Sequence, residues 1–97
     1  MYQISSTILE QEFNGLQAKK IVADENLEVL TISLENGSEF PEHTSPRDAF
    51  LVLLEGLIEF HINNKNFLLQ KQQTFNFPAG VPHTVTAKMN SKFLIIR

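Results

Sequence analysis

Two histidines and a serine are the side chains of this sequence whose types and spacing best suit a chemical site. His43 and Ser45 lie two positions apart, and His83 directly follows segment 78–82, which reads Pro-Ala-Gly-Val-Pro. Proline fixes the backbone and glycine permits conformations that strain other residues, so this segment predicts a tight turn before a strand that begins at His83. Imidazoles bind metals, form hydrogen bonds and transfer protons, although His83 alone could also be a surface residue at a strand edge.

Short strands must position these side chains, because nearly all the periodicity of the sequence is strand-like. Alternating apolar and polar residues, or short apolar runs bounded by turn residues, are typical of strands. Such segments occupy residues 27–34, 49–54, 57–62, 67–69, 74–77, 83–87 and 93–96. The prolines at 41, 46, 78 and 82 are all predicted to lie between strands. This pattern predicts an all-β jelly roll of about eight strands.

The N-terminal region, residues 1–26, contains two further predicted strands, Ile4–Leu9 and Lys19–Ala23. A chain of 97 residues forms one domain, 1–97, with a modest core, and it has no cysteine to add a disulfide or a thiolate metal site. Dimerisation is the usual remedy, and N-terminal strands can extend a partner's sheet. We therefore expect a homodimer.

The charges argue against some partners and suggest how the strands are arranged. The net charge of −3 argues against a nucleic-acid partner, and no apolar run or leader pattern points to a membrane, so a soluble cytoplasmic protein is expected. All eleven acidic residues lie at or before Glu59, whereas five of the eight basic residues follow it. We interpret this as early and late strands lying side by side. A basic C-terminal region for anionic partners is the alternative.

Two segments resemble the motifs of the cupin family. The first family motif reads Gly, five residues, His-x-His, three or four residues, Glu, six residues, Gly. The second reads Gly, five residues, Pro-x-Gly-x-x-His, three residues, Asn. The spacing fits from Gly37 to Gly56 and from Gln72 to Ala87. This resemblance implies a cupin double-stranded β-helix, or jelly-roll barrel.

The resemblance also implies a metal site of which only half is present. His43 and His83 stand at two of the family's four ligand positions, while Ser45 replaces the second histidine of His-x-His and Ala49 replaces the glutamate. Catalytic metal sites generally need three protein ligands, and a serine hydroxyl is a poor ligand for iron or zinc. The expected cofactor is therefore none, or a divalent metal weakly bound by His43 and His83.

Asp48 and His61 are the two other side chains that could replace the missing metal ligands. Asp48 precedes position 49 and should point to the opposite face of a strand, unless a bulge near Pro46 turns it inward. His61 lies between apolar residues of a strand and is either a solvent-side or packed histidine or an extra ligand.

The family geometry implies a pocket in the mouth of the barrel. Its expected lining is His43, Ser45, Leu51, Leu53, His83 and Val85. An apolar hollow with a few convergent polar groups is the general form of a small-molecule site. The sequence thus predicts a module that binds or senses an unknown small molecule. One alternative is a cupin enzyme of dioxygenase or sugar isomerase/epimerase type that uses His43 and His83, with or without metal. A second is a structural partner that acts through its dimer surface. A third is a vestigial pocket that binds nothing.

Overall fold

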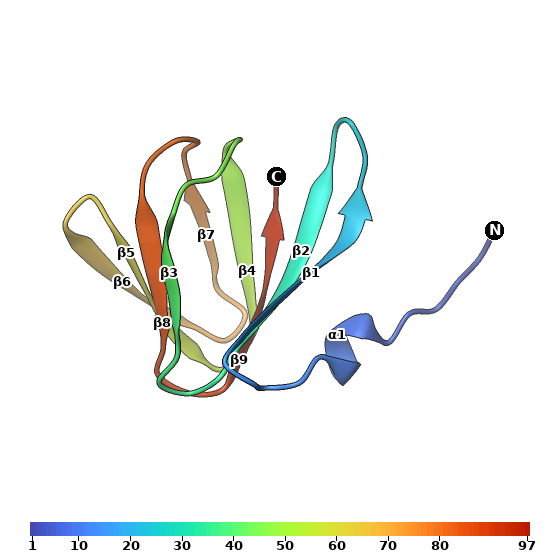
Figure 1. Ribbon diagram of the computed structural model, residues 1–97, viewed down its shortest axis with the longest axis horizontal. Coiled ribbons are helices and arrows are strands. Elements are labelled where there is room, and N and C mark those ends of the chain that lie inside the picture. Colours follow the sequence, from blue (N-terminus) through green and yellow to red (C-terminus); the bar gives the residue numbers. More distant parts are fainter.

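Nine strands and one helical turn make up the fold (Figure 1), and the computed structural model describes residues 1–97. The elements are α1 (Thr7–Glu10), β1 (Leu16–Ala23), β2 (Glu28–Leu34), β3 (Glu39–His43), β4 (Ala49–Glu55), β5 (Leu57–Ile62), β6 (Lys65–Gln70), β7 (Thr74–Phe77), β8 (His83–Ala87) and β9 (Ser91–Ile96). One sheet has the order β1-β2-β9-β4-β7 and the other the order β3-β8-β5-β6, and all pairings are antiparallel. The predicted all-β jelly roll is confirmed.

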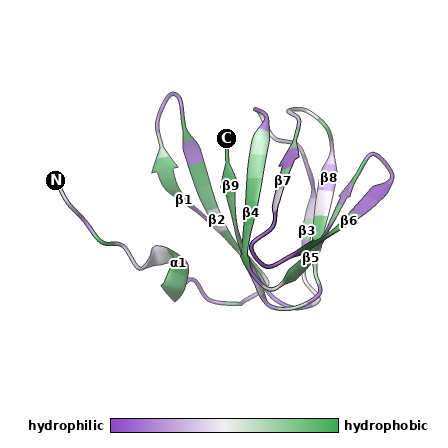
Figure 2. Ribbon diagram, turned by 180° about the vertical axis from the view of Figure 1, so that it is seen from behind, coloured by the Kyte–Doolittle hydropathy of each residue, from purple (hydrophilic) through white to green (hydrophobic).

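The core lies between the two sheets, and the side-chain alternation of the strands builds it. In β5 the residues Ile58, Phe60 and Ile62 are buried, as their alternation with polar neighbours predicts. Phe60 from one sheet and Phe93 from the other are both fully buried. Hydrophobic colouring follows β2, β9 and β4 through the middle of the larger sheet (Figure 2). No helix has the length and apolar character that crossing a membrane requires.

Gly56, the last residue of the first motif, holds a turn that no other residue would fit. Its φ is +96°, a region that strains residues with a side chain. A Cβ at this position would lie 2.5 Å from the carbonyl oxygen of Asn90 and still closer to the hydroxyl of Ser91. That hydroxyl accepts a hydrogen bond from the Leu57 amide, so the chain passes tightly between β4 and β5 here.

Strand β3 was not predicted, and Pro41 lies inside it rather than between strands. The strand is at the edge of the smaller sheet, and its register with β8 shifts between Phe40 and His43. Edge strands and bulges are the places where a sheet tolerates proline, since no ladder donor is lost there.

The prediction of a strand at Ile4–Leu9 is wrong. Residues 1–6 extend away from the barrel (Figure 1), Ile4 is fully exposed, and α1 follows. The buried ammonium of Lys92 in β9 donates to the carbonyl oxygens of Ile8 and Leu9, at 2.7 and 3.1 Å. These bonds tie the end of α1 to the outer face of the larger sheet. The second predicted N-terminal strand, Lys19–Ala23, lies within β1.

Candidate functional site

A cavity of about 160 Å³ lies between the two sheets. It is next to the β3–β4 and β7–β8 connections, at the upper end of the barrel in Figure 1. Most of its wall is apolar and comes from both sheets, and the polar side chains that reach it are few. The apolar wall includes Leu30, Ile32, Phe40, Phe60, Phe77 and Ile95. The polar lining consists of His43, Thr44, Ser45, His83 and Arg97.

His43 and His83 meet in this cavity because they are direct cross-strand neighbours in β3 and β8. Their Nε2 atoms are 3.1 Å apart. The Nδ1 atom of His43 lies 2.6 Å from the carbonyl oxygen of Pro41, and Nδ1 of His83 lies 2.9 Å from that of Val81. Each ring is therefore anchored by the backbone carbonyl two residues before it.

These contacts determine where the protons of the two rings lie. A carbonyl oxygen only accepts hydrogen bonds, so both Nδ1 atoms must carry hydrogen. In a neutral imidazole the other nitrogen is then an acceptor, which leaves two Nε2 lone pairs facing each other across 3.1 Å. Such a pair needs a proton, a donor or a cation between or beside its two nitrogens.

Aromatic packing holds both rings in place. His43 stacks on Phe40 with ring centroids 4.0 Å apart, and His83 contacts Phe60 and Phe77 at 5.1 and 4.6 Å. Only 3% of His83 is exposed to solvent. Both imidazoles are thus held with their Nε2 atoms toward the cavity.

Burial lowers the pKa of His83, because a charged imidazole is poorly solvated among phenylalanines. The hydrogen bond to Val81 opposes this shift, whereas the charges of His43 and Arg97 add to it. At neutral pH His83 is therefore held in its neutral form, with the Nε2 lone pair free.

Ser45 lines the cavity, and the loop that carries it is fastened to the turn before His83. The Ser45 hydroxyl donates to the carbonyl oxygen of Arg47 at 2.6 Å. The backbone carbonyl of Ser45 accepts from the Gly80 amide at 2.9 Å, and an Asp48 carboxylate oxygen accepts from the Ala79 amide at 2.9 Å. Asp48 therefore clamps the Pro-Ala-Gly turn, and it is not turned into the cavity as a ligand.

Ser45 and Ala49 do not share one strand face with His43. β3 ends at His43, residues 44–48 form a loop, and Ala49 begins β4 in the opposite sheet. Ser45 reaches the cavity from this loop, whereas Ala49 is buried opposite Phe77 and does not line it. Strand parity relates residues within one strand, so it does not relate His43 to a residue in the loop or to one in the other sheet.

Of the apolar residues predicted to line the pocket, Val85 does so and Leu51 and Leu53 do not. Both leucines are fully buried in the core of the larger sheet. They have the parity of inward-pointing residues, but they pack in the core outside the hollow.

His61 lies away from the cavity. Its Nδ1 atom is 2.6 Å from the Asn66 amide oxygen, and its Nε2 atom is 3.2 Å from the Thr86 hydroxyl. It therefore belongs to the polar face of β5 and is not a replacement ligand for the missing histidine.

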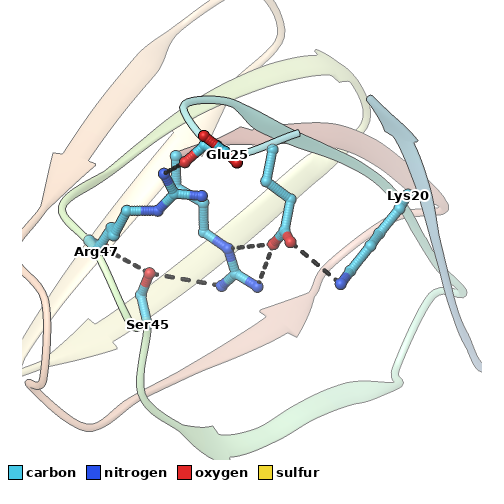
Figure 3. A network of polar contacts seen from close by, with 6 residues as sticks. Lys20, Glu25, Ser45 and Arg47 are labelled. Atoms are coloured by element: carbon cyan, nitrogen blue, oxygen red, sulfur yellow. Dashed lines mark hydrogen bonds and ion pairs between the residues drawn. The ribbon is translucent and has the colours of Figure 1, made fainter. Parts of the chain in front are cut away.

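Thr44 and Arg97 are polar residues of the cavity that were not predicted, and Arg97 is the charged one. Its Nε and Nη2 atoms both lie 2.7 Å from Glu28 Oε1, while Lys20 Nζ lies 3.1 Å from Glu28 Oε2 (Figure 3). Hydrogen bonds from Arg97 and then Lys20 lower the pKa of the Glu28 carboxyl. Arg97 follows the inward-pointing Phe93 and Ile95 at the same parity, and that alternation is the signal that would have found it. The pairing of Glu28 with Arg97 also agrees with early and late strands being neighbours.

The residues of the cavity fit only part of a metal site. Nitrogens 3.1 Å apart suit two neighbouring ligands of one ion at about 2.1 Å. However, no group of three histidine, cysteine, aspartate or glutamate side chains comes together to hold a metal. The Ser45 hydroxyl is already bonded to Arg47, and Ala49 has no donor atom. The family's four-ligand set is therefore not formed.

The two sheets, with a small hollow at one end and histidines from adjacent strands inside it, define a jelly-roll barrel with a site in its mouth. The sequence model of the family described as Cupin domain matches residues 30–96. The chain therefore belongs to the cupin family. A comparison with curated proteins found no match.

Many solved structures share this fold. The conserved protein SPY1581 of unknown function from Streptococcus pyogenes is 26% identical, with a TM-score of 0.84 over 99% of this chain and 86% of that one. A cupin 2 conserved barrel domain protein from Leptotrichia buccalis is 28% identical, with a TM-score of 0.83 over 95% of this chain and 45% of that one. An RmlC-like cupin from Desulfovibrio desulfuricans has a TM-score of 0.84 at 23% identity, over 98% and 95% of the two chains. At that identity the likeness concerns the fold alone.

Proposed function

We propose that this protein is a small-molecule-binding or sensing cupin whose ligand enters the mouth of the barrel. In this proposal the site works through His43, His83 and Arg97 rather than through a four-ligand metal centre. The observation that carries it is the facing pair of Nε2 lone pairs in an apolar hollow, because that pair lacks a donor that a ligand would supply. Apolar walls with a few convergent polar groups are typical of ligand sites.

The size of the hollow sets the size of the ligand. Its volume of about 160 Å³ is close to the ~150 Å³ of an engineered cavity that binds benzene. The ligand is therefore a molecule of about that size, or a somewhat larger one that extends through the open end.

Fragment binding followed by NMR tests this proposal. Fragments of benzene size should shift the resonances of the cavity lining in the wild-type protein. Ala18 on β1 lines the cavity and is exposed, so Ala18→Phe should block binding while leaving the core intact. Ala23→Phe, at an exposed position of the same strand outside the cavity, is the matched control. Binding that Ala18→Phe leaves unchanged, or no binding of any fragment, would reject the proposal.

A second candidate function is proton transfer by the same histidines, as in a metal-free isomerase or epimerase. The observation that favours it is the buried, neutral His83, whose Nε2 lone pair could remove a proton from a bound ligand and return it. Incubating each bound fragment in D₂O tests this directly. Deuterium entering a C–H position with wild type but not with His83→Gln would support an enzyme, and binding without exchange would support a binding module.

A further inference from the structure

We propose that the ligand is a small hydroxy-carboxylate, with its carboxylate on Arg97 and its hydroxyl at the Nε2 atoms of His43 and His83. This inference rests on the proposed function, since it names the chemistry that the same cavity would recognise. It depends on which hydrogen-bonding capacity each end of the cavity leaves unused.

Arg97 has donors to spare at one end of the cavity. A guanidinium carries five N–H groups in a planar fork. Glu28 takes one from Nε and one from Nη2, on one side of the fork. The Nη1 atom is 3.5 Å from the Ser45 hydroxyl, which is too long for a strong bond and places Nη1 beside a residue of the cavity wall. The remaining N–H groups of Nη1 and Nη2 form the pair that binds a carboxylate in the usual two-pronged way.

The charge at this end also favours an anion. Arg97 and Lys20 share the single carboxylate of Glu28, so these three side chains together carry one positive charge. Arg97 and Glu28 are mostly buried, with 19% and 15% of their side chains exposed. An anion entering the cavity would therefore meet a partly desolvated cation, where charge–charge attraction is weakly screened.

The other end of the cavity requires a donor. Both Nε2 atoms are acceptors because both Nδ1 atoms donate to backbone carbonyls. A hydroxyl beside the two Nε2 atoms supplies the hydrogen that neither ring holds there. An ammonium is a poorer match, because the positive charge of Arg97 reaches His83 and opposes a second cation. The apolar lining, which includes Phe60, Phe77 and Ile95, suits a hydrocarbon body.

Two matched series of probes test the inference by calorimetry. The first is 3-hydroxybenzoate, benzoate and 3-hydroxybenzamide, and the second is 3-hydroxybutyrate, butyrate and 3-hydroxybutyramide. In at least one series the hydroxy acid should bind roughly tenfold more tightly than the plain acid or the amide. The amide loses the charge-assisted hydrogen bonds to Arg97, and the plain acid leaves both Nε2 atoms without a donor. Arg97→Gln, alone or with Glu28→Gln to avoid an unpaired carboxylate, should abolish the preference for acid over amide. Lys19→Gln, on the exposed face of β1 and outside both the cavity and the Glu28 ion pairs, should retain that preference.

The outcomes separate this inference from the proposed function. If cavity fragments bind but acids and amides bind equally, the carboxylate assignment is wrong and the binding module stands. If hydroxy acids and plain acids bind equally, the two Nε2 atoms do not accept the ligand hydroxyl as proposed. If neither these probes nor any benzene-sized fragment binds, the proposed function fails as well.

Discussion

The buried position of His83 predicts that the protein loses stability as pH falls through the range in which histidine titrates. Because the pKa of His83 is lowered in the folded state, the unfolded chain binds a proton that the folded chain does not. The contribution of the neutral, buried His83 to the free energy of unfolding is fully present above the ordinary histidine pKa of about 6.5 and declines below it. The decline is at most about 1.4 kcal/mol per pH unit for this one proton, down to the pKa of the folded state.

Urea denaturation at half-unit steps from pH 7.5 to 5 measures this slope. The range ends above the region where carboxylates such as Glu28, whose pKa is lowered, begin to contribute. His83→Gln should remove most of the slope, whereas His61→Gln should retain it because His61 lies on the polar outer face. A stability that rises as pH falls would refute the reasoning, because it would mean that the two Nε2 atoms hold a shared proton tightly. A flat profile would mean that His83 is not buried as described.

Three further predictions concern assembly and metal. Light scattering should show a homodimer that deletion of residues 1–12 weakens, because residues 1–6 are exposed and pair with no strand of their own chain. A monomer at roughly tens of micromolar would contradict this. Elemental analysis of protein purified without an affinity tag should find far less than one divalent metal per chain, and one tightly held iron, zinc or manganese per chain would contradict it. The double change Ser45→His with Ala49→Glu should lower the melting temperature without metal and raise it with manganese or nickel. Ser45 lines the cavity and Ala49 pairs with the cavity residue Phe77, so the two longer side chains should reach His43 and His83. If these ions stabilise the double variant no more than the parent, the introduced side chains do not reach the two histidines.

Most of the fold could be predicted from the sequence because the evidence for strands is local. The alternation at 57–62 and the Asn63-Asn64 turn define a hairpin without knowledge of the rest of the chain, because asparagine tolerates the positive φ that both residues have. Motif spacing then places His43 and His83 in the same barrel. In the structure the two histidines are direct neighbours.

What the sequence did not reveal depends on tertiary structure. β3 escaped prediction because Pro41 is unusual in a strand, and only its place at a sheet edge makes it acceptable. Ile4–Leu9 was predicted as a strand because apolar residues occur there, yet no sheet receives that segment. Apolar pattern alone does not show whether a neighbouring strand exists.

The site was only half predictable for the same reason. Motif spacing assigns His43, Ser45 and Ala49 to one ligand set, but it does not show that the chain changes sheets between His43 and Ala49. The alternation of Phe93, Ile95 and Arg97 is local, but the contact of Arg97 with Glu28 depends on the long-range pairing of β9 with β2. The charges of early and late strands pointed toward such a pairing but could not indicate that Arg97 would face the cavity.

Nitrogen-15 NMR of the histidine rings tests the central claim most directly, that the two Nε2 lone pairs form the acceptor end of a ligand site. At pH 7.5 both His43 and His83 should show hydrogen on Nδ1 and none on Nε2. Addition of 3-hydroxybenzoate or 3-hydroxybutyrate should shift both Nε2 resonances together while leaving His61 unchanged. A spectrum in which either ring carries its hydrogen on Nε2, or in which neither acid moves the two Nε2 resonances, would contradict the account.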